Sequence, residues 1–260
     1  MKRIIRKIYE ALPPSSRRKV KELNDKIFPP SIEPLMYRIE LFEELKKLTG
    51  KNLLNGIRIL EIGPRDGLDS KRLESLSPKE FVIIDLPERS RGNEKWFSGL
   101  SCPKKYIEGN FMYMPTEEFN ALGKFDLIWF TGILYHNAEQ MRMLRKLYRL
   151  LNVGGYLVME SATLRASRFL RNRSVVEICY PKTYRDTGTV THLPTKGAIK
   201  SWLKMVGFKE IQDSNCYGKY NKDILNSRYA CICKKNGEDE SGAYYQKSGL
   251  NPEYRFGDSI

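Results

Sequence analysis

Apolar residues follow two different periods along this chain, and the two kinds of stretch alternate. Short runs that are almost continuously apolar are typical of strands buried on both faces of a sheet. Stretches in which apolar residues recur every third or fourth position are typical of amphipathic helices. The predicted strands are IRILEI (57–62), EFVIIDL (80–86), KFDLIWFTGIL (124–134) and GYLVMES (155–161), and the predicted helices are EPLMYRIELFEELKKLTG (33–50), DSKRLESL (69–76), AEQMRMLRKLYRLL (138–151) and THLPTKGAIKSWLKMVGF (191–208).

Two further strands are predicted late in the chain, KEIQDSN (209–215) and RYACICKK (228–235), with no helix between them. Strands that alternate with helices of about 10–15 residues are typical of a doubly wound α/β sheet. The absence of a predicted helix between the last two strands indicates that these two pair antiparallel. We therefore expect an α/β fold, a doubly wound Rossmann-like sheet with an antiparallel hairpin at its edge.

Three segments fall outside this alternation and set the expected organisation of the chain. An insertion over 162–194 is rich in Arg, Tyr and Pro, and insertions of this length are usually functional or disordered. We expect a basic helical segment over 1–32, an α/β domain over 33–235 that contains the insertion, and a polar tail over 236–260.

The first segment has the composition of a helix that lies on a membrane surface. Residues 1–30 contain nine Lys and Arg against three acids. Ile4, Ile5, Ile8 and Leu12 fall on one helical face, with the charges mostly elsewhere, as in helices that bind anionic lipid. A helix that packs on the domain has the same pattern, so both interpretations stay open.

Composition narrows the class of protein. The chain has 260 residues, 41% hydrophobic residues and a net charge of +14. No apolar run approaches the ~18 residues that a membrane-spanning helix needs. The net charge indicates a polyanionic partner, which leaves nucleic acid, an anionic membrane and phosphorylated substrates open. Five irregularly spaced cysteines indicate a reducing, intracellular compartment, and with only two histidines we predict no metal site.

Candidate chemistry begins in the stretch RILEIGPRDGLDS (58–70), where a strand ends in an acid and two glycines follow. Glycines at a strand tip let the backbone turn sharply and approach a ligand. The pattern Glu61-x-Gly63-x-x-x-Gly67 differs from the dinucleotide fingerprint and suits a cationic ligand without phosphate. Asp85, at the tip of the next strand, is placed to hold two ribose hydroxyls.

These motifs resemble those of the class I S-adenosylmethionine-dependent methyltransferases. EIGPRDG looks like the first motif of that family and IIDLP like the second, and EGNFMYMP, FDLIWFTGILYHN and LLNVGGYLVMES resemble the three that follow. The resemblance implies a seven-stranded sheet and S-adenosylmethionine as the cofactor. It also implies the following cofactor-binding residues: Glu61, Gly63, Pro64, Gly67, Asp85, Leu86, Asn110, Phe111, Thr131 and Gly132.

A closer likeness concerns the catalytic core. FTGILYHNAEQMRMLRKLYRLLNVGGYLVMES and THLPTKGAIKSWLKMVGFKEI are similar to the family of tRNA wobble-uridine carboxymethyltransferases. The chain is shorter than that family's proteins, and CYGKYNKDILNSRY lacks their arginine-rich segment. We therefore expect a shared catalytic core that acts on a different acceptor.

Catalytic candidates follow from the chemistry of methyl transfer to a hydroxyl. A general base helps that reaction, and histidine suits neutral pH. His136 follows the fourth predicted strand, His192 ends the insertion, and Glu160 is placed to orient either of them. A capping or packing role is the alternative for His136. The insertion combines arginines with aromatic residues, and the predicted acceptor-binding residues are Tyr135, Arg168, Tyr180, Tyr184 and Arg185.

The sequence thus predicts an S-adenosylmethionine-dependent enzyme that O-methylates a small anionic or sugar-containing acceptor, with lipid-linked and surface-glycan acceptors of polysaccharide biosynthesis included. We expect it in the cytoplasm, with peripheral contact to the anionic inner membrane face. An RNA (tRNA) methyltransferase or carboxymethyltransferase is the alternative, which the charge and the second likeness support. A protein that binds the cofactor without catalysis is a third interpretation.

Overall fold

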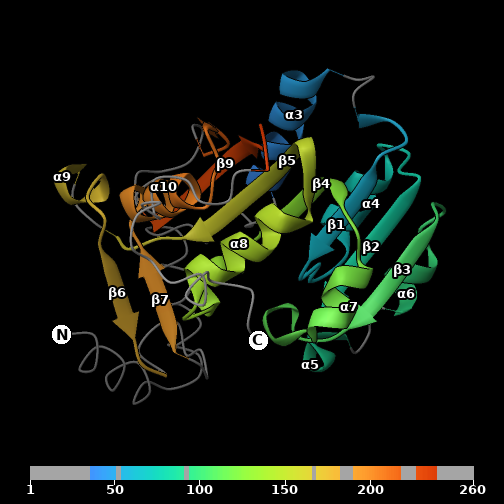
Figure 1. Ribbon diagram of the computed structural model, residues 1–260, viewed down its shortest axis with the longest axis horizontal. Helices are drawn as coiled ribbons and strands as arrows, with labels where there is room; N and C mark the ends of the chain where they lie inside the picture. The colour runs from blue at the N-terminus through green and yellow to red at the C-terminus, as the bar shows by residue number, and fades with distance from the viewer. Residues whose placement is uncertain are drawn as a thin grey trace, which may run out of the picture. The chain divides into compact units, whose positions relative to one another are not determined.

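The computed structural model describes residues 36–50, 54–90, 94–165, 168–181, 190–217 and 227–238 (Figure 1). The chain divides into two units, residues 1–39 and 40–260, and of the first unit only the start of one helix is described. The predicted membrane-binding segment over 1–32, the tail beyond 238 and the candidates Tyr184 and Arg185 lie outside the described residues.

The described residues form alternating helices and strands. The elements are α3 (Met36–Thr49), β1 (Arg58–Ile62), α4 (Leu68–Glu74), β2 (Glu80–Asp85), α5 (Pro87–Ser90), α6 (Glu94–Ser98), β3 (Lys104–Glu108), the 3₁₀ turn η2 (Phe111–Tyr113), α7 (Thr116–Ala121), β4 (Phe125–Thr131), the 3₁₀ turn η3 (Leu134–His136), α8 (Gln140–Leu150), β5 (Leu151–Ala162), α9 (Arg168–Arg171), β6 (Val176–Cys179), β7 (Thr191–Pro194), α10 (Lys196–Met205), β8 (Glu210–Asp213) and β9 (Arg228–Lys234).

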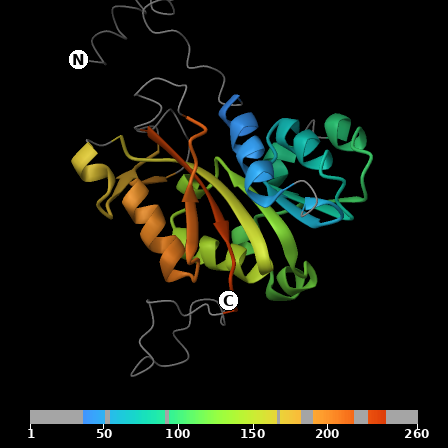
Figure 2. The same ribbon diagram turned by 90° about the horizontal axis from the view of Figure 1, so that it is seen from above.

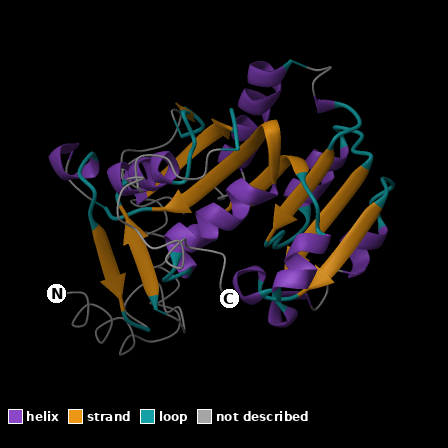
Figure 3. Ribbon diagram, in the orientation of Figure 1, coloured by secondary structure: helices purple, strands orange, loops and turns teal. Residues whose placement is uncertain are grey.

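Seven strands form one sheet in the order β3-β2-β1-β4-β5-β9-β8 (Figure 3). The pairs from β3 to β5 are parallel, whereas β9 is antiparallel to both β5 and β8. The predicted Rossmann-like seven-stranded fold with antiparallel edge strands is therefore confirmed. Strand order reverses between β1 and β4, and ligands of such sheets bind beyond the carboxyl ends of the strands at that point.

Helices pack on both faces of the sheet (Figure 2). Alternate residues of the central strands, such as Ile62 and Phe130, join one buried cluster with residues of α8 and α10. Residues that point the other way include Trp129, whose ring packs edge-on against Phe42 of α3 with centroids 6.3 Å apart. Burial on both faces explains why these strands appear in the sequence as continuous apolar runs.

Three strands, β3, β6 and β7, differ from the sequence prediction. The stretch predicted as one helix over 191–208 contains β7, and α10 begins only at Lys196, where the Thr195 hydroxyl accepts a hydrogen bond from the Ala198 amide. β7 exists because it pairs antiparallel with β6, a contact that no local pattern reveals. β3 was not among the predicted strands because it lies at the sheet edge and is half-exposed.

The β6–β7 hairpin and α9 give structure to much of the insertion predicted over 162–194. The hairpin is a separate two-stranded sheet. In Figures 1 and 2 it lies beyond β5 on the side away from β1–β3. No helix among the described residues is long and apolar enough to cross a membrane.

Candidate active site

We call the predicted cofactor-binding residues Glu61, Gly63, Gly67 and Asp85 the cofactor cradle. Gly63 lies directly after β1 in a left-handed conformation with φ of 67°. Its amide donates to the Ile84 carbonyl of β2 at 2.9 Å, which fixes the turn. A Cβ atom here would lie 2.7 Å from the side chain of Ile133, the residue that follows the β4 turn. The backbone angle therefore favours glycine at Gly63, and a larger residue would also displace the end of the Ile133 side chain.

Gly67 closes the same loop and also has a left-handed φ, of 74°. A Cβ atom there would lie 2.2 Å from the indole ring of Trp96 in α6. Packing against Trp96 is thus sufficient to explain a glycine at this position, without the close approach of a ligand. Between the two glycines, Pro64 is buried, whereas Arg65 is exposed and has a positive φ of 61°.

Two carboxylates lie at the carboxyl ends of the parallel strands β1 and β2. Glu61 is 1% exposed, and the Ser70 hydroxyl of α4 donates to its Oε2 at 2.5 Å. Asp85 ends β2 at 7% exposure, and its Oδ1 accepts from the Leu86 amide at 2.9 Å. Both carboxylates are largely withdrawn from water, so a ligand's amine or hydroxyl donors would interact strongly with them.

The segment after β3 carries two of the predicted cofactor-binding residues, Asn110 and Phe111. The Asn110 side chain accepts from the Met112 amide at 3.0 Å and so caps η2, although the residue is exposed. Phe111 is 3% exposed and packs on Phe119, with ring centroids 6.1 Å apart. Their predicted contacts with the cofactor stay predictions, and the structure adds a capping role for Asn110 and a packing role for Phe111.

Lys146 of α8 fastens this segment to the rest of the domain. Its Nζ donates to the carbonyls of Phe111 and Met112, at 3.0 and 2.7 Å, and lies 5.0 Å from the Phe119 ring centroid. Burial, and to a smaller extent the positive charge of Arg142, lowers the pKa of Lys146 from its usual 10.5 to about 8.

Three exposed apolar side chains follow the carboxyl ends of β1, β2 and β3. Leu68 begins α4, Leu86 follows β2 and Tyr113 ends η2, and their exposed fractions are 42%, 39% and 67%. Apolar surface beside buried carboxylates is what an adenosine with a charged amino-acid chain requires. The residues present at these strand ends therefore fit S-adenosylmethionine.

The turn after β4, at Thr131 and Gly132, connects the sheet to the segment that carries His136. Thr131 is buried, and the Gly132 amide donates to the Glu160 carbonyl at 2.8 Å. η3 follows, with the rings of Tyr135 and His136 in contact at a centroid distance of 4.0 Å. His136 is exposed and Tyr135 is half-buried.

Gln140 joins the segments that carry the two histidines. It is 4% exposed, and its Nε2 donates to the Leu134 carbonyl of η3 at 3.2 Å and to the His192 carbonyl of β7 at 3.0 Å. The amide therefore holds the β6–β7 hairpin against the turn that follows β4. Sequence reasoning missed Gln140, because a glutamine in the first turn of a helix carries no distinctive signal.

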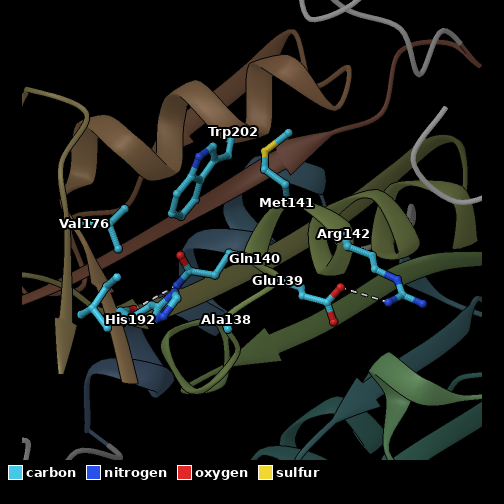
Figure 4. A pocket seen from close by; sticks show the side chains of 9 residues that line it. Ala138, Glu139, Gln140, Met141, Arg142, Val176, His192 and Trp202 are labelled. Atoms are coloured by element: carbon cyan, nitrogen blue, oxygen red, sulfur yellow. Dashed lines mark hydrogen bonds and ion pairs between the residues drawn. The ribbon is translucent and has the colours of Figure 1, made fainter. Parts of the chain in front are cut away.

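A pocket of about 350 Å³ lies beside this junction (Figure 4). Its walls come from the start of α8, from the hairpin and from α10. Trp202 projects from α10 near Val176 and Met141, and the ion pair between Arg142 and Glu139 lies at another wall. The lining residues are Ala138, Glu139, Gln140, Met141, Arg142, Val176, Ile178, His192 and Trp202. His192 thus lies in the wall of this pocket, and Ala138, two residues after His136 in the sequence, also lines it.

Glu160 has partners other than the histidines. It is fully buried in β5, its Oε1 accepts from the Tyr217 hydroxyl at 2.8 Å, and Arg228 of β9 donates to both of its oxygens, at 2.5 and 2.9 Å. A buried carboxylate needs such compensation. These contacts give Glu160 a role in joining β5 to β9, and the predicted role of orienting a histidine gains no support from them.

The remaining acceptor candidates lie on the insertion. Tyr180 follows β6 and is 69% exposed. Arg168 begins α9, but its side chain lies outside the described part of the structure, as do Tyr184 and Arg185. Their contact with an acceptor stays a prediction.

Comparison with known proteins supplies a family. The model of a family described as "Methyltransferase domain" matches residues 36–213. Two curated relatives are named tRNA U34 carboxymethyltransferase. The one from Desulforapulum autotrophicum is 27% identical over 59% of this chain and 45% of its own length, and the one from Syntrophotalea carbinolica is 33% identical over 61% and 47%. The chain thus spans about half the length of these relatives.

Solved structures agree on the fold. The N-terminal domain of EvdMO1, solved with SAH and D-fucose, superposes with a TM-score of 0.58 at 15% identity, covering 84% of this chain and 97% of that one. The N-methyltransferase NodS from Bradyrhizobium japonicum gives a TM-score of 0.51 at 18% identity, covering 79% and 100%. At these identities the likeness concerns the fold alone.

Proposed function

This chain belongs to the methyltransferase-domain family and is an S-adenosylmethionine-dependent methyltransferase, and on that premise we propose that it methylates an oxygen of a small anionic or sugar-containing acceptor. One observation carries the proposal: a pocket of about 350 Å³ adjoins the turn after β4 and has a histidine in its wall. That volume suits part of a small molecule.

The cradle residues hold the cofactor in this proposal. Asp85 accepts hydrogen bonds from the ribose hydroxyls, and Glu61 faces the positively charged amino-acid end. Leu86 contributes apolar contact, and the turns at Gly63 and Gly132 bring the backbone close. When bound, S-adenosylmethionine supplies a methyl group on a positively charged sulfur.

The histidines act on the acceptor. His136 or His192 would accept the proton of the acceptor hydroxyl at an imidazole nitrogen, while that oxygen would take the methyl group as its bond to the cofactor's sulfur breaks, which would leave S-adenosylhomocysteine. Gln140 keeps the two histidine-bearing segments together, which limits the positions that the acceptor can take. Tyr135 and Tyr180 flank the acceptor, with the insertion's arginines placed for its negative charge.

We further propose that the enzyme works in the cytoplasm and that its acceptor belongs to polysaccharide biosynthesis, with the basic segment over 1–32 resting on the inner membrane face. The five cysteines are free thiols, as a reducing compartment allows. The net charge of +14 supports an anionic partner.

A transfer assay tests the proposal. The full chain is incubated with methyl-labelled S-adenosylmethionine and, in separate reactions, with nucleotide sugars, sugar phosphates, lipid-linked glycans and unmodified tRNA. We expect label on a sugar-containing acceptor. We also expect the rate to fall roughly 10²–10⁴-fold in whichever of His136→Asn and His192→Asn removes the base, while calorimetry shows unchanged cofactor binding.

Two results would overturn these assignments. Label on tRNA alone would establish the alternative function, for which the named relatives are the precedent. Full activity in both histidine variants would show that neither residue is the base.

A further inference from the structure

The lining of the pocket is mainly apolar, and the polar side chains other than His192 interact with other groups of the protein. Met141, Val176, Ile178 and Trp202 present hydrocarbon or aromatic surface. The Gln140 amide donates to two backbone carbonyls, and Arg142 is paired with Glu139 at 3.0 Å. The sugar or other polar part of the acceptor is therefore expected at the mouth of the pocket, because hydroxyls enclosed by this lining would mostly lack partners and their desolvation is unfavourable.

The apolar wall continues outward along the hairpin. Val176, Ile178 and Tyr180 alternate along β6 and the residue beyond it, with exposed fractions of 36%, 57% and 69%. Ile178 is directly opposite His192 of β7, and both residues line the pocket. Side chains two apart on a strand share a face, so this face extends from the pocket toward solvent.

The segment of the insertion that carries this face is rich in positive charge. Between 163 and 181 the sequence has four arginines and one acid, Glu177. Arg165 and Arg173 are exposed, and the Arg173 guanidinium lies 5.4 Å from the ring centroid of Phe169, which is itself 76% exposed. Exposed apolar side chains beside arginines are a surface for a ligand that is both hydrophobic and anionic.

We propose that this pocket binds the hydrocarbon chain of an anionic amphiphilic acceptor, whose charged head lies against the arginines of the insertion. The inference rests on the proposed function, since it names the class of acceptor that the enzyme methylates. A folded RNA presents phosphates and stacked bases and has no hydrocarbon segment for a pocket of about 350 Å³. A neutral lipid would gain no electrostatic attraction from the positive charge of the insertion.

Chain length provides the sharpest test. Calorimetric titration of the full chain uses inorganic phosphate, octyl phosphate and decyl phosphate, each kept below the concentration at which it forms micelles. Each methylene buried contributes about fourfold in affinity, so decyl phosphate, with two more methylenes, should bind roughly fifteenfold more tightly than octyl phosphate. Inorganic phosphate should give no heat. Octyl maltoside, which has a neutral head, should bind more weakly than octyl phosphate.

A matched pair of variants tests whether decyl phosphate binds in this pocket. Ile178→Gln adds a polar group to the pocket wall, and Val153→Gln makes the same kind of change at a residue of β5 with a similar exposed fraction, 54% against 57%. We expect Ile178→Gln to weaken decyl phosphate binding at least fivefold and Val153→Gln to leave it unchanged. Equal affinity for the octyl and decyl compounds, or equal binding by both variants, would overturn the proposal.

The proposed function is tested separately in the same samples. Titration with S-adenosylmethionine reports the cradle, which neither variant touches. Binding of S-adenosylmethionine without any chain-length effect would refute the amphiphile alone. Loss of S-adenosylmethionine binding in the wild-type chain would refute the proposed function itself.

Discussion

At the scale of single residues, the glycines before and after β1 show that a positive φ can have different causes. Gly56, Gly63 and Gly67 all have positive φ, of 67°, 67° and 74°. A Cβ atom at Gly56 would meet nothing within 4 Å, whereas at Gly67 it would collide with Trp96. The sequence correctly marked the glycine loop as special, but it could not reveal that α6 packs over it, since that contact joins residues distant in the chain.

The pair Gly56→Ala and Gly67→Ala separates these two causes. Gly56→Ala should cost about 1–2 kcal/mol of unfolding free energy, the strain of a left-handed alanine. Gly67→Ala should cost a further 1–3 kcal/mol or so, because its methyl group overpacks against Trp96. Urea unfolding measures both. In the Trp96→Ala background the extra cost should shrink, and an undiminished cost there would show that Trp96 is not its source.

At the scale of elements, α8 is fastened by two lysines. Lys235, fully buried, donates to the Tyr148 and Leu151 carbonyls at the end of the helix, at 3.1 and 3.0 Å. The Leu151 amide also donates to the Tyr148 carbonyl, so the lysine adds a second donor where α8 ends and β5 begins. Lys146 ties the middle of α8 to η2. The helix therefore links the segment after β3 to the pocket that its own first turn lines.

Because the pKa of Lys146 is lowered in the folded chain, the free energy of unfolding depends on pH. Below pH 8 the lysine is charged in the folded and unfolded chains, and the folded chain bears the cost of burying that charge. Between about pH 8 and 10.5 the folded chain has released the proton while the unfolded chain still holds it, so stability rises with pH.

We therefore expect the unfolding free energy of the wild type to increase relative to Lys146→Met as the pH rises from 8 to 10.5. Urea unfolding at several pH values measures this difference. Lys204→Met, which changes an exposed lysine of α10, is the matched control and should follow the wild type. Parallel profiles for the wild type and Lys146→Met would contradict the account of the burial of Lys146.

How far the sequence predicts the elements depends on where their stabilising contacts come from. β1, β2, β4 and β5 are buried runs whose composition alone identifies them. β7 was predicted as helix because its stability comes from pairing with β6. The site follows the same rule: strand-end residues such as Asp85 were foreseen from local pattern, whereas Gln140 and the pocket depend on contacts between distant segments.

At the scale of the whole described domain, the sheet places two different surfaces on either side of the β1–β4 reversal. The ends of β1 and β2 present buried carboxylates beside exposed apolar residues. The turn after β4 and the hairpin present histidines and an apolar pocket. Gln140 holds the second surface together through hydrogen bonds to η3 and β7. A cofactor on the first surface and an acceptor on the second would then meet at the turn after β4.

The most direct test of this account is a calorimetric titration of the full chain with S-adenosylmethionine, S-adenosylhomocysteine and NAD, repeated with Asp85→Ala and with Glu118→Ala as an exposed control. We predict micromolar binding of the first two ligands and none of NAD. Asp85→Ala should lose about 1–3 kcal/mol of binding free energy, because the ribose hydroxyls lose their buried acceptor, and Glu118→Ala should lose nothing. Binding of NAD alone, or unchanged affinity in Asp85→Ala, would contradict the cofactor cradle at the strand ends.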